Sequence, residues 1–98
     1  MDVDKQLGFL KQQCENVDSE LLILLKRRFQ TERRMVEARL KNGMEAQDRD
    51  RDVEVIDYVL KKSREMGISD TFIHSLYGVI MDYSETVQKE YIDSQSKK

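Results

Sequence analysis

Hydrophobic residues recur at alternating steps of three and four positions along the N-terminal part of the chain. The residues of this stripe are Leu7, Leu10, Cys14, Val17, Leu21 and Leu24. A heptad period of this kind is typical of a helix that packs along its length against another helix. The same count continues through Arg28, Thr31, Met35 and Ala38. Asn42-Gly43 then supplies a helix stop, so the pattern predicts one long helix over residues 4–41.

The predicted helix is too long for a chain of this size to enclose. About 38 residues of helix span roughly 57 Å, whereas a compact domain of this size has a radius of gyration near ~13 Å. The remaining residues cannot surround it. We therefore expect the apolar stripe to pack against another copy of the chain or against another protein.

Two shorter helices are predicted after a loop over residues 42–47. Asp48 or Asp50 is expected to cap the first of them, which ends at Gly67, and Ser69 to cap the second. The second carries a stripe at steps of four and three, formed by Ile73, Tyr77, Ile80, Ser84, Val87 and Tyr91. The predicted fold class is all-α, with one long and two shorter helices. Residues 1–98 are expected to form one domain, with a core over about residues 7–91 and a polar, frayed tail over residues 93–98.

Composition and hydropathy argue against some classes of binding partner, above all a membrane. The 98 residues include no proline and four glycines, and 37% are charged against a usual share of roughly 25%. No apolar run approaches the ~20 residues of a membrane span. The N-terminus has no apolar signal-peptide core, so we expect a cytoplasmic protein without a membrane partner.

The charge balance also argues against nucleic acid as a partner. Seventeen basic and nineteen acidic residues give a net charge of −2, whereas nucleic-acid binders usually concentrate a basic excess on one face. One cysteine and one histidine cannot form a disulfide framework or a zinc site of the usual ligand types. No metal site is expected.

Polar residues interrupt the helical stripes at positions where apolar residues are expected. Arg28 replaces a seam residue, and Arg39, eleven residues later, is rotated from it by only about 20° and lies about 16 Å along the axis. Both side chains can reach toward one small anion between them. The alternative is that Arg28 extends to solvent and buries only its stem.

Two further sets of polar residues favour the same kind of pocket. Ser84 and Gln88 lie four residues apart on one helix face, and Asp48, Arg51 and Asp52 cluster where free backbone N–H groups favour bound oxygens. Ordinary capping, surface ion pairs and hydrogen bonds to backbone or water would explain each set separately. Together they predict a cationic, hydrogen-bonding pocket within a helical bundle.

The chain from about Leu7 to Tyr91 resembles the all-helical chorismate mutases of the intertwined-dimer type. The residues that carry the resemblance are Val17-Asp18, Leu21-Leu22, Leu24-Leu25, Arg27-Arg28, Arg39, Asp48-x-x-Arg51-Asp52 and Ser84-x-x-x-Gln88. The resemblance implies two interlocked copies whose active sites draw residues from both chains. It also implies a cofactor-free rearrangement of chorismate to prephenate, a step of aromatic amino-acid biosynthesis.

The resemblance also implies a role for each candidate residue. Arg28, with Lys11 of the other chain, would grip the side-chain carboxylate of chorismate. Lys11 and Arg28 of one chain lie about 25 Å apart along the helix, so a two-fold partner is needed to bring such a pair together. Arg51 and Ser84 would bind the ring carboxylate, and Arg39 and Gln88 the ether oxygen. Asp52, with Asp48, would hold the ring hydroxyl.

Three positions depart from the family pattern, which usually has Arg at Lys11, Lys at Arg39 and Glu at Asp52. All three substitutions preserve charge, but Arg and Lys differ in fork geometry and hydration, so activity is expected to change in level more than in type. Two alternatives remain. One is an isochorismate-pyruvate lyase on the same scaffold, and the other is a non-catalytic helical dimerisation module.

Overall fold

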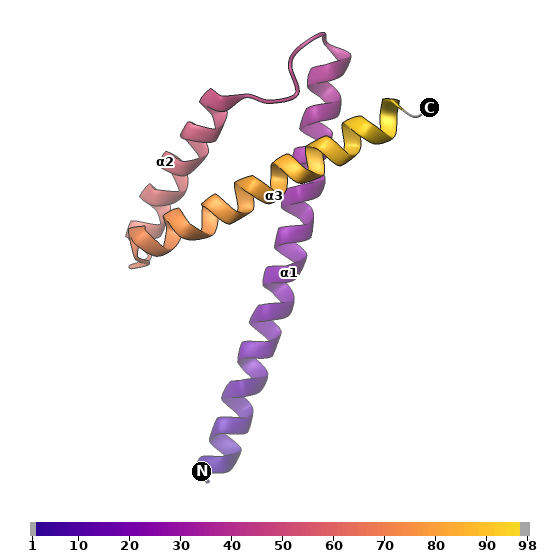
Figure 1. Ribbon diagram of the computed structural model, residues 1–98. Helices are drawn as coiled ribbons and strands as arrows, with labels where there is room; N and C mark the ends of the chain where they lie inside the picture. Colours follow the sequence, from indigo (N-terminus) through magenta and orange to yellow (C-terminus); the bar gives the residue numbers. More distant parts are fainter. Residues whose placement is uncertain (1, 97–98) are drawn as a thin grey trace. The chain divides into compact units, whose positions relative to one another are not determined.

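The computed structural model describes residues 2–96 and contains three α-helices (Figure 1). α1 spans Val3–Lys41, α2 spans Arg49–Glu65 and α3 spans Asp70–Ser96. No strand occurs among the described residues, so the all-α fold class with one long and two shorter helices is confirmed. None of these helices is long and apolar enough to cross a membrane. The chain divides within α1 into a first unit up to Thr31 and a second unit from Glu32 onward.

Local hydrogen bonds set both ends of α1. At the start, the Asp2 carboxylate accepts a hydrogen bond from the backbone N–H of Asp4 at 3.0 Å. At the end, Gly43 has a φ of +69°, and the N–H of Met44 donates back to the carbonyl of Arg39 at 2.8 Å. This is the hydrogen bond of a Schellman motif, which needs a left-handed residue after the helix. The helix stop predicted at Asn42-Gly43 is therefore confirmed.

The caps of α2 and α3 are those that the sequence predicts. The Asp48 side chain accepts a hydrogen bond from the N–H of Arg51 at 3.1 Å and so begins α2. Gly67, with a φ of +74°, follows the end of α2. The N–H of Phe72 donates to the Ser69 hydroxyl at 3.4 Å, and this begins α3. These segments follow their local sequence signals, because caps depend on neighbouring residues alone.

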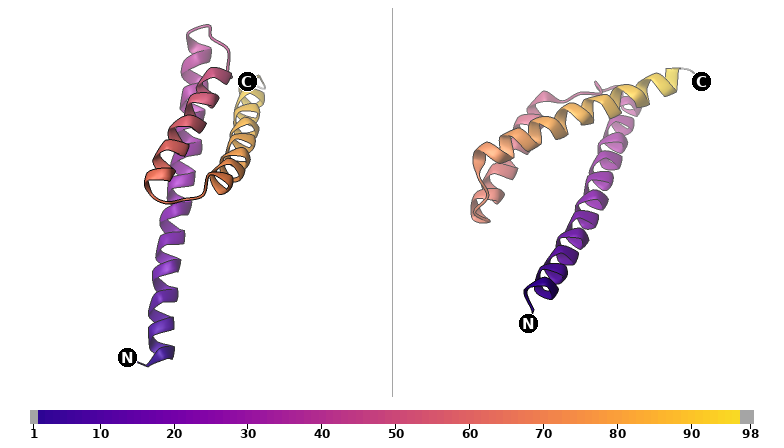
Figure 2. Two further views of the ribbon diagram at one scale, coloured as in Figure 1. Left: turned by 90° about the vertical axis from the view of Figure 1, so that its left-hand side faces the viewer. Right: turned by 60° about the horizontal axis from the view of Figure 1, so that its bottom comes forward.

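Within the second unit, α2 and α3 run in opposite directions side by side (Figure 2). A surface ion pair joins the end of α2 to the start of α3, with the Arg64 and Asp70 side chains 2.9 Å apart. The hydrogen bond from Arg64 lowers the pKa of the Asp70 carboxyl below its usual value. The short connection between these helices therefore fixes an antiparallel helical hairpin.

The core of the second unit contains few apolar side chains. Among the described residues, the buried hydrophobic ones are Val36, Leu60, Ile73 and Ile80. Four buried polar or charged residues lie with them: Glu32, Ser63, Ser84 and Gln88. A core in which polar residues are as numerous as apolar ones gives little hydrophobic stabilisation, since burying one aliphatic side chain contributes about 1.5–3 kcal/mol.

The last turns of α1 bury a different face in the single chain from the one that the heptad count follows. Thr31 and Ala38 of that count are exposed and Met35 is half-buried, so their packing against a partner stays a prediction. Glu32 and Val36 are the buried residues of this segment. Glu32 accepts a hydrogen bond from Arg51 of α2 within the second unit.

The C-terminal segment also differs from the prediction. α3 continues to Ser96, so the fraying expected from Asp93 is wrong for residues 93–96. The Ser94 hydroxyl donates to the carbonyl of Tyr91 at 2.7 Å, and the Ser96 hydroxyl to that of Asp93 at 3.0 Å. These hydroxyls satisfy carbonyls near the helix end, which a polar composition does not reveal. Lys97 and Lys98 lie outside the described residues.

The apolar stripe of the first unit is exposed to solvent in the single chain. Its aliphatic members keep about half of their area accessible: Leu7 58%, Leu10 45%, Val17 60%, Leu21 52% and Leu24 54%. Cys14, in the same stripe, is exposed as well. An apolar surface of this extent, running along a helix, is characteristic of an interaction face.

Candidate functional site

Six of the eight predicted site residues line one narrow pocket in the second unit. α1 contributes Arg39, and the start of α2 contributes Asp48, Arg51 and Asp52. α3 contributes Ser84 and Gln88. The free volume is about 10 Å³, enough for roughly one water molecule. The other lining residues are Glu32, Gln47, Met81 and Glu85.

Simple features of the sequence bring these residues together. The Asp48 cap begins α2, and this places Arg51 and Asp52 in its first turn. Ser84 and Gln88 lie one turn apart on α3 and continue the buried face that contains Ile80. Because the polar positions extend the apolar faces of their helices, they point toward the same interior.

Glu32 is the charged pocket residue with the lowest exposure that the sequence analysis missed. Glu32 is 3% exposed, and its carboxylate accepts from the Arg51 guanidinium at 3.2 and 3.4 Å. The residue lies in a run of charged side chains, which is typical of a solvated helix face. The burial of Glu32 could have been inferred from its position, since it precedes the fully buried Val36 by one helical turn.

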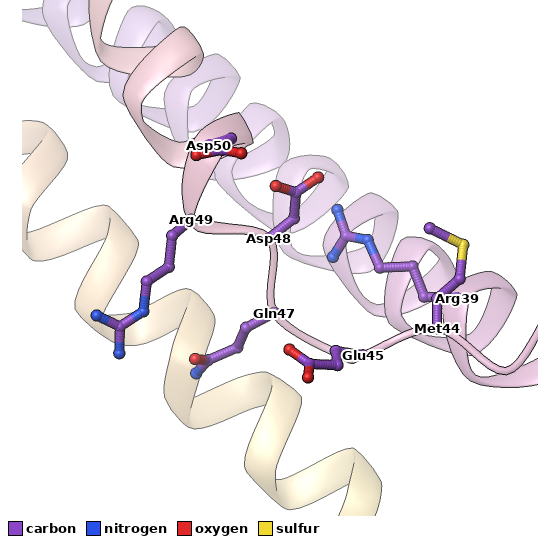
Figure 3. Close-up of a pocket in the computed structure, with 7 residues that line it drawn as sticks. All are labelled: Arg39, Met44, Glu45, Gln47, Asp48, Arg49 and Asp50. Carbon is purple, nitrogen blue, oxygen red and sulfur yellow. The ribbon is translucent and has the colours of Figure 1, made fainter.

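Arg39 holds the loop that leads into α2. Its guanidinium donates a hydrogen bond to the carbonyl of Ala46 at 2.8 Å. An open hollow of about 550 Å³ also lies along this loop, and it shares Arg39, Gln47 and Asp48 with the narrow pocket (Figure 3). The hollow lacks the buried polar side chains of α3. We therefore assign the candidate site to the narrow pocket, although it is the smaller of the two.

The α3 side of the pocket presents an unsatisfied acceptor. Gln88 is 8% exposed, and its Oε1 atom is buried without a hydrogen-bond partner among the described residues. Ser84, one turn earlier, is 3% exposed. A buried amide oxygen without a partner costs about 1–3 kcal/mol. A donor group on a bound molecule would satisfy it.

Burial and neighbouring carboxylates alter the acidity of Asp52. Burial is the main cause that raises the pKa of the Asp52 carboxyl above its usual value, and the Arg51 guanidinium opposes this rise. The carboxylates of Glu32, Glu85 and Asp48 raise this pKa further. Asp52 therefore lies where additional negative charge is unfavourable.

The lining of the pocket is acidic in formal charge. Its carboxylates are those of Glu32, Asp48, Asp52 and Glu85, and its guanidinium groups are those of Arg39 and Arg51. Four acidic groups against two basic groups give a formal excess of two negative charges when all are ionised. The second unit alone is therefore poorly matched to a doubly charged anion.

The remaining two predicted residues belong to the first unit. Lys11 is exposed and Arg28 is half-buried. Their predicted roles concern a ligand shared with another chain, so the pocket of the second unit does not test them. Among residues 2–96 there is also no cluster of His, Cys, Asp or Glu side chains that could hold a metal ion.

Comparisons with known proteins identify the family. The family model described as chorismate mutase type II matches residues 10–89. Comparisons with curated proteins and with solved structures each found no match. The matched segment includes all eight predicted site residues, from Lys11 to Gln88. It covers far more than half of an all-helical chain, so this chain belongs to the chorismate mutase type II family.

Proposed function

We propose that this protein is a homodimeric chorismate mutase that rearranges chorismate to prephenate. The family match supports an isomerase of this type. The observation that carries the proposal is the convergence of Arg39, Arg51, Ser84 and Gln88 on one pocket from three helices. We further propose that the enzyme acts in the cytoplasm, in aromatic amino-acid biosynthesis.

The reaction is an intramolecular rearrangement. The ether C–O bond of the substrate breaks, and a C–C bond forms between the enolpyruvyl arm and the ring. No electrons are gained or lost, and no group leaves the molecule, so no cofactor is required. The enzyme must hold a flexible dianion in its reactive conformation. It must also stabilise the negative charge that grows on the ether oxygen as the bond breaks.

Arg39 and Gln88 are the proposed partners of the ether oxygen. Both line the pocket, and Gln88 is buried while Arg39 is half-buried. In our proposal Arg39 turns from the carbonyl of Ala46 toward the substrate, and the Gln88 amide donates through Nε2. A cation and a neutral donor aimed at this atom favour the transition state over the ground state, because the charge is greater there.

Arg51 and Ser84 are the proposed partners of the ring carboxylate, and Asp52 with Asp48 those of the ring hydroxyl. A guanidinium group can grip a carboxylate with two parallel hydrogen bonds. Asp52 is one methylene shorter than the Glu usual at this position, so its hydrogen bond to the hydroxyl should be longer. None of these residues has to act as a general acid or base.

A second copy of the chain would complete the site. Arg28, with Lys11 of the partner chain, would grip the side-chain carboxylate. These two cations would offset the formal excess of negative charge in the pocket of the second unit. The exposed apolar stripe of the first unit supports such a dimer, because it offers a continuous surface for helix pairing.

An assay of the purified protein with chorismate tests this function. We expect prephenate to accumulate, with a helical dimer found by sedimentation. Release of pyruvate from isochorismate without prephenate formation would instead identify an isochorismate-pyruvate lyase. Absence of turnover on both substrates at high protein concentration would overturn the proposal and favour a non-catalytic dimerisation module.

A further inference from the structure

Arg51 is held both at its backbone and at the tip of its side chain in the absence of a ligand. Its backbone N–H donates to the Asp48 carboxylate at 3.1 Å, in the first turn of α2. Its Nη1 atom donates to the two oxygens of the Glu32 carboxylate, at 3.2 and 3.4 Å. The Glu32 side chain is 4% exposed and that of Arg51 is 27% exposed. Because little water reaches this contact, it restricts a side chain that otherwise has many rotamers.

We propose that Glu32 is a positioning residue, which holds the Arg51 guanidinium in the orientation that binds the ring carboxylate of the substrate. This inference rests on the proposed function, which assigns that carboxylate to Arg51. The hydrogen bonds to Glu32 use Nη1 alone. A guanidinium has five N–H donors in a planar fork, so Nη2 and Nε can bind a second carboxylate with two parallel hydrogen bonds. Glu32 and the substrate would therefore bind different edges of one guanidinium.

Glu32 also keeps Arg51 away from the other carboxylates of the pocket. Three of these line it, those of Asp48, Asp52 and Glu85. Burial raises the pKa of the Asp52 carboxyl above its usual value, and this outweighs the lowering by Arg51. A direct ion pair with Arg51 would lower that pKa. With Arg51 held by Glu32, the Asp52 carboxylate stays available to the ring hydroxyl that is assigned to it.

Nuclear magnetic resonance of the ligand-free protein tests this positioning directly. In isotope-labelled wild type, the heteronuclear NOE of the Arg51 Nε–H group should match that of the helix backbone. Arg49, an exposed residue of the same helix, should show the low value of a mobile side chain. Glu32→Ala should lower the Arg51 value, because the guanidinium then exchanges among solvent and the other carboxylates. Glu32→Gln should preserve it, since the Gln amide oxygen can still accept from Nη1.

Two small molecules measure the effect on carboxylate binding without turnover. Phenoxyacetate carries one carboxylate on an ether-linked arm, and its meta-carboxy derivative adds a second on the ring. Calorimetry should show that wild type binds the dicarboxylate more tightly. Glu32→Ala should reduce this advantage about tenfold, the upper end of the effect of ordering one long side chain, and Glu32→Gln should keep most of it. A purely electrostatic role predicts the opposite sign, because removal of a negative charge favours the second carboxylate.

Steady-state kinetics with chorismate should follow the same order. Glu32→Ala is expected to raise KM about tenfold with little change in kcat, because Arg51 is proposed to grip the ring carboxylate equally in the ground and transition states. Glu32→Gln should recover most of the loss. Glu37→Gln is the matched control and should equal wild type, because Glu37 is on the same helix but pairs with the exposed Lys41 at 3.3 Å. An equal loss in both Glu32 variants, mainly in kcat, would indicate a structural role and overturn the inference.

The outcomes separate this inference from the proposed function. If wild type converts chorismate, but Glu32→Ala keeps Arg51 ordered and retains the full advantage of the dicarboxylate, the inference is wrong. If no variant converts chorismate, but Glu32→Ala loses both properties, the positioning role stands and the mutase assignment fails. If Glu32→Ala does not fold, wild type still decides, since a mobile Arg51 side chain in the ligand-free wild type would overturn the inference.

Discussion

Replacement of Arg39 by Ala is expected to lower kcat/KM for chorismate about a hundred- to a thousandfold, as removal of one donor from a developing oxyanion does in other enzymes. In the proposed site, Arg39 supplies the only cation at the ether oxygen, and the charge on that atom grows as the C–O bond breaks. Because the interaction strengthens in the transition state, most of the loss should appear in kcat. Steady-state kinetics of prephenate formation measure this effect.

Two variants control for the other contribution of Arg39, which holds the loop through the carbonyl of Ala46. Arg39→Lys keeps the cation and one donor and restores the residue usual in the family, so it should retain most of the activity. Arg33→Ala removes the same charge from the same helix, where Arg33 lies 5.1 Å from the ring centre of Tyr91, and should leave kcat/KM unchanged. Full activity in Arg39→Ala with unchanged helicity would show that the cation at the ether oxygen is wrongly assigned.

Replacement of Leu21 by Glu should dissociate the dimer and abolish activity. Leu21 is 52% exposed in the single chain and lies within the apolar stripe of the first unit. Each copy would lose about 1.5–3 kcal/mol of hydrophobic burial, and the symmetric interface contains the change twice. Two carboxylates would also have to enter an apolar seam without partners. Sedimentation should report a monomer, and circular dichroism a lower helix content.

Ser19→Glu is the matched control for this prediction. Ser19 is exposed on the side of α1 opposite to the stripe, about 200° from Leu21 around the helix. The variant introduces the same carboxylate into the same helix and should remain dimeric and active. A dimeric Leu21→Glu protein, or equal dissociation of both variants, would mean that the stripe does not form the interface.

The helix ends could be predicted because their determinants are local. Asp48, Ser69, Gly43 and Gly67 all act as the sequence indicates, since each cap depends on a few neighbouring residues. The contact between the end of α1 and α2 could not be predicted in this way. A heptad count assumes one straight partner, but Glu32 in the second unit contacts a residue of α2.

The candidate site also contains residues whose burial could be predicted and residues whose burial could not. Ser84 and Gln88 were predictable as buried, because they interrupt an otherwise apolar stripe. The pairing of Glu32 with Arg51 was not, because nineteen residues separate them and both belong to segments rich in charge. When a charged residue is buried because it pairs with a residue far away in the sequence, no periodic pattern of hydrophobic positions reveals it. The roles of Lys11 and Arg28 stay predictions, since they depend on a second chain.

Mixing two inactive variants tests most directly whether two chains share a mutase site. Lys11→Ala and Arg39→Ala should each have little activity alone. A mixed dimer has one site that receives both altered residues and one that receives neither. Random reassociation of equal amounts should therefore restore about a quarter of the wild-type activity, since half of the dimers are mixed and each has one intact site. No recovery, with mixed dimers demonstrated by mass spectrometry, would contradict a site built from both chains.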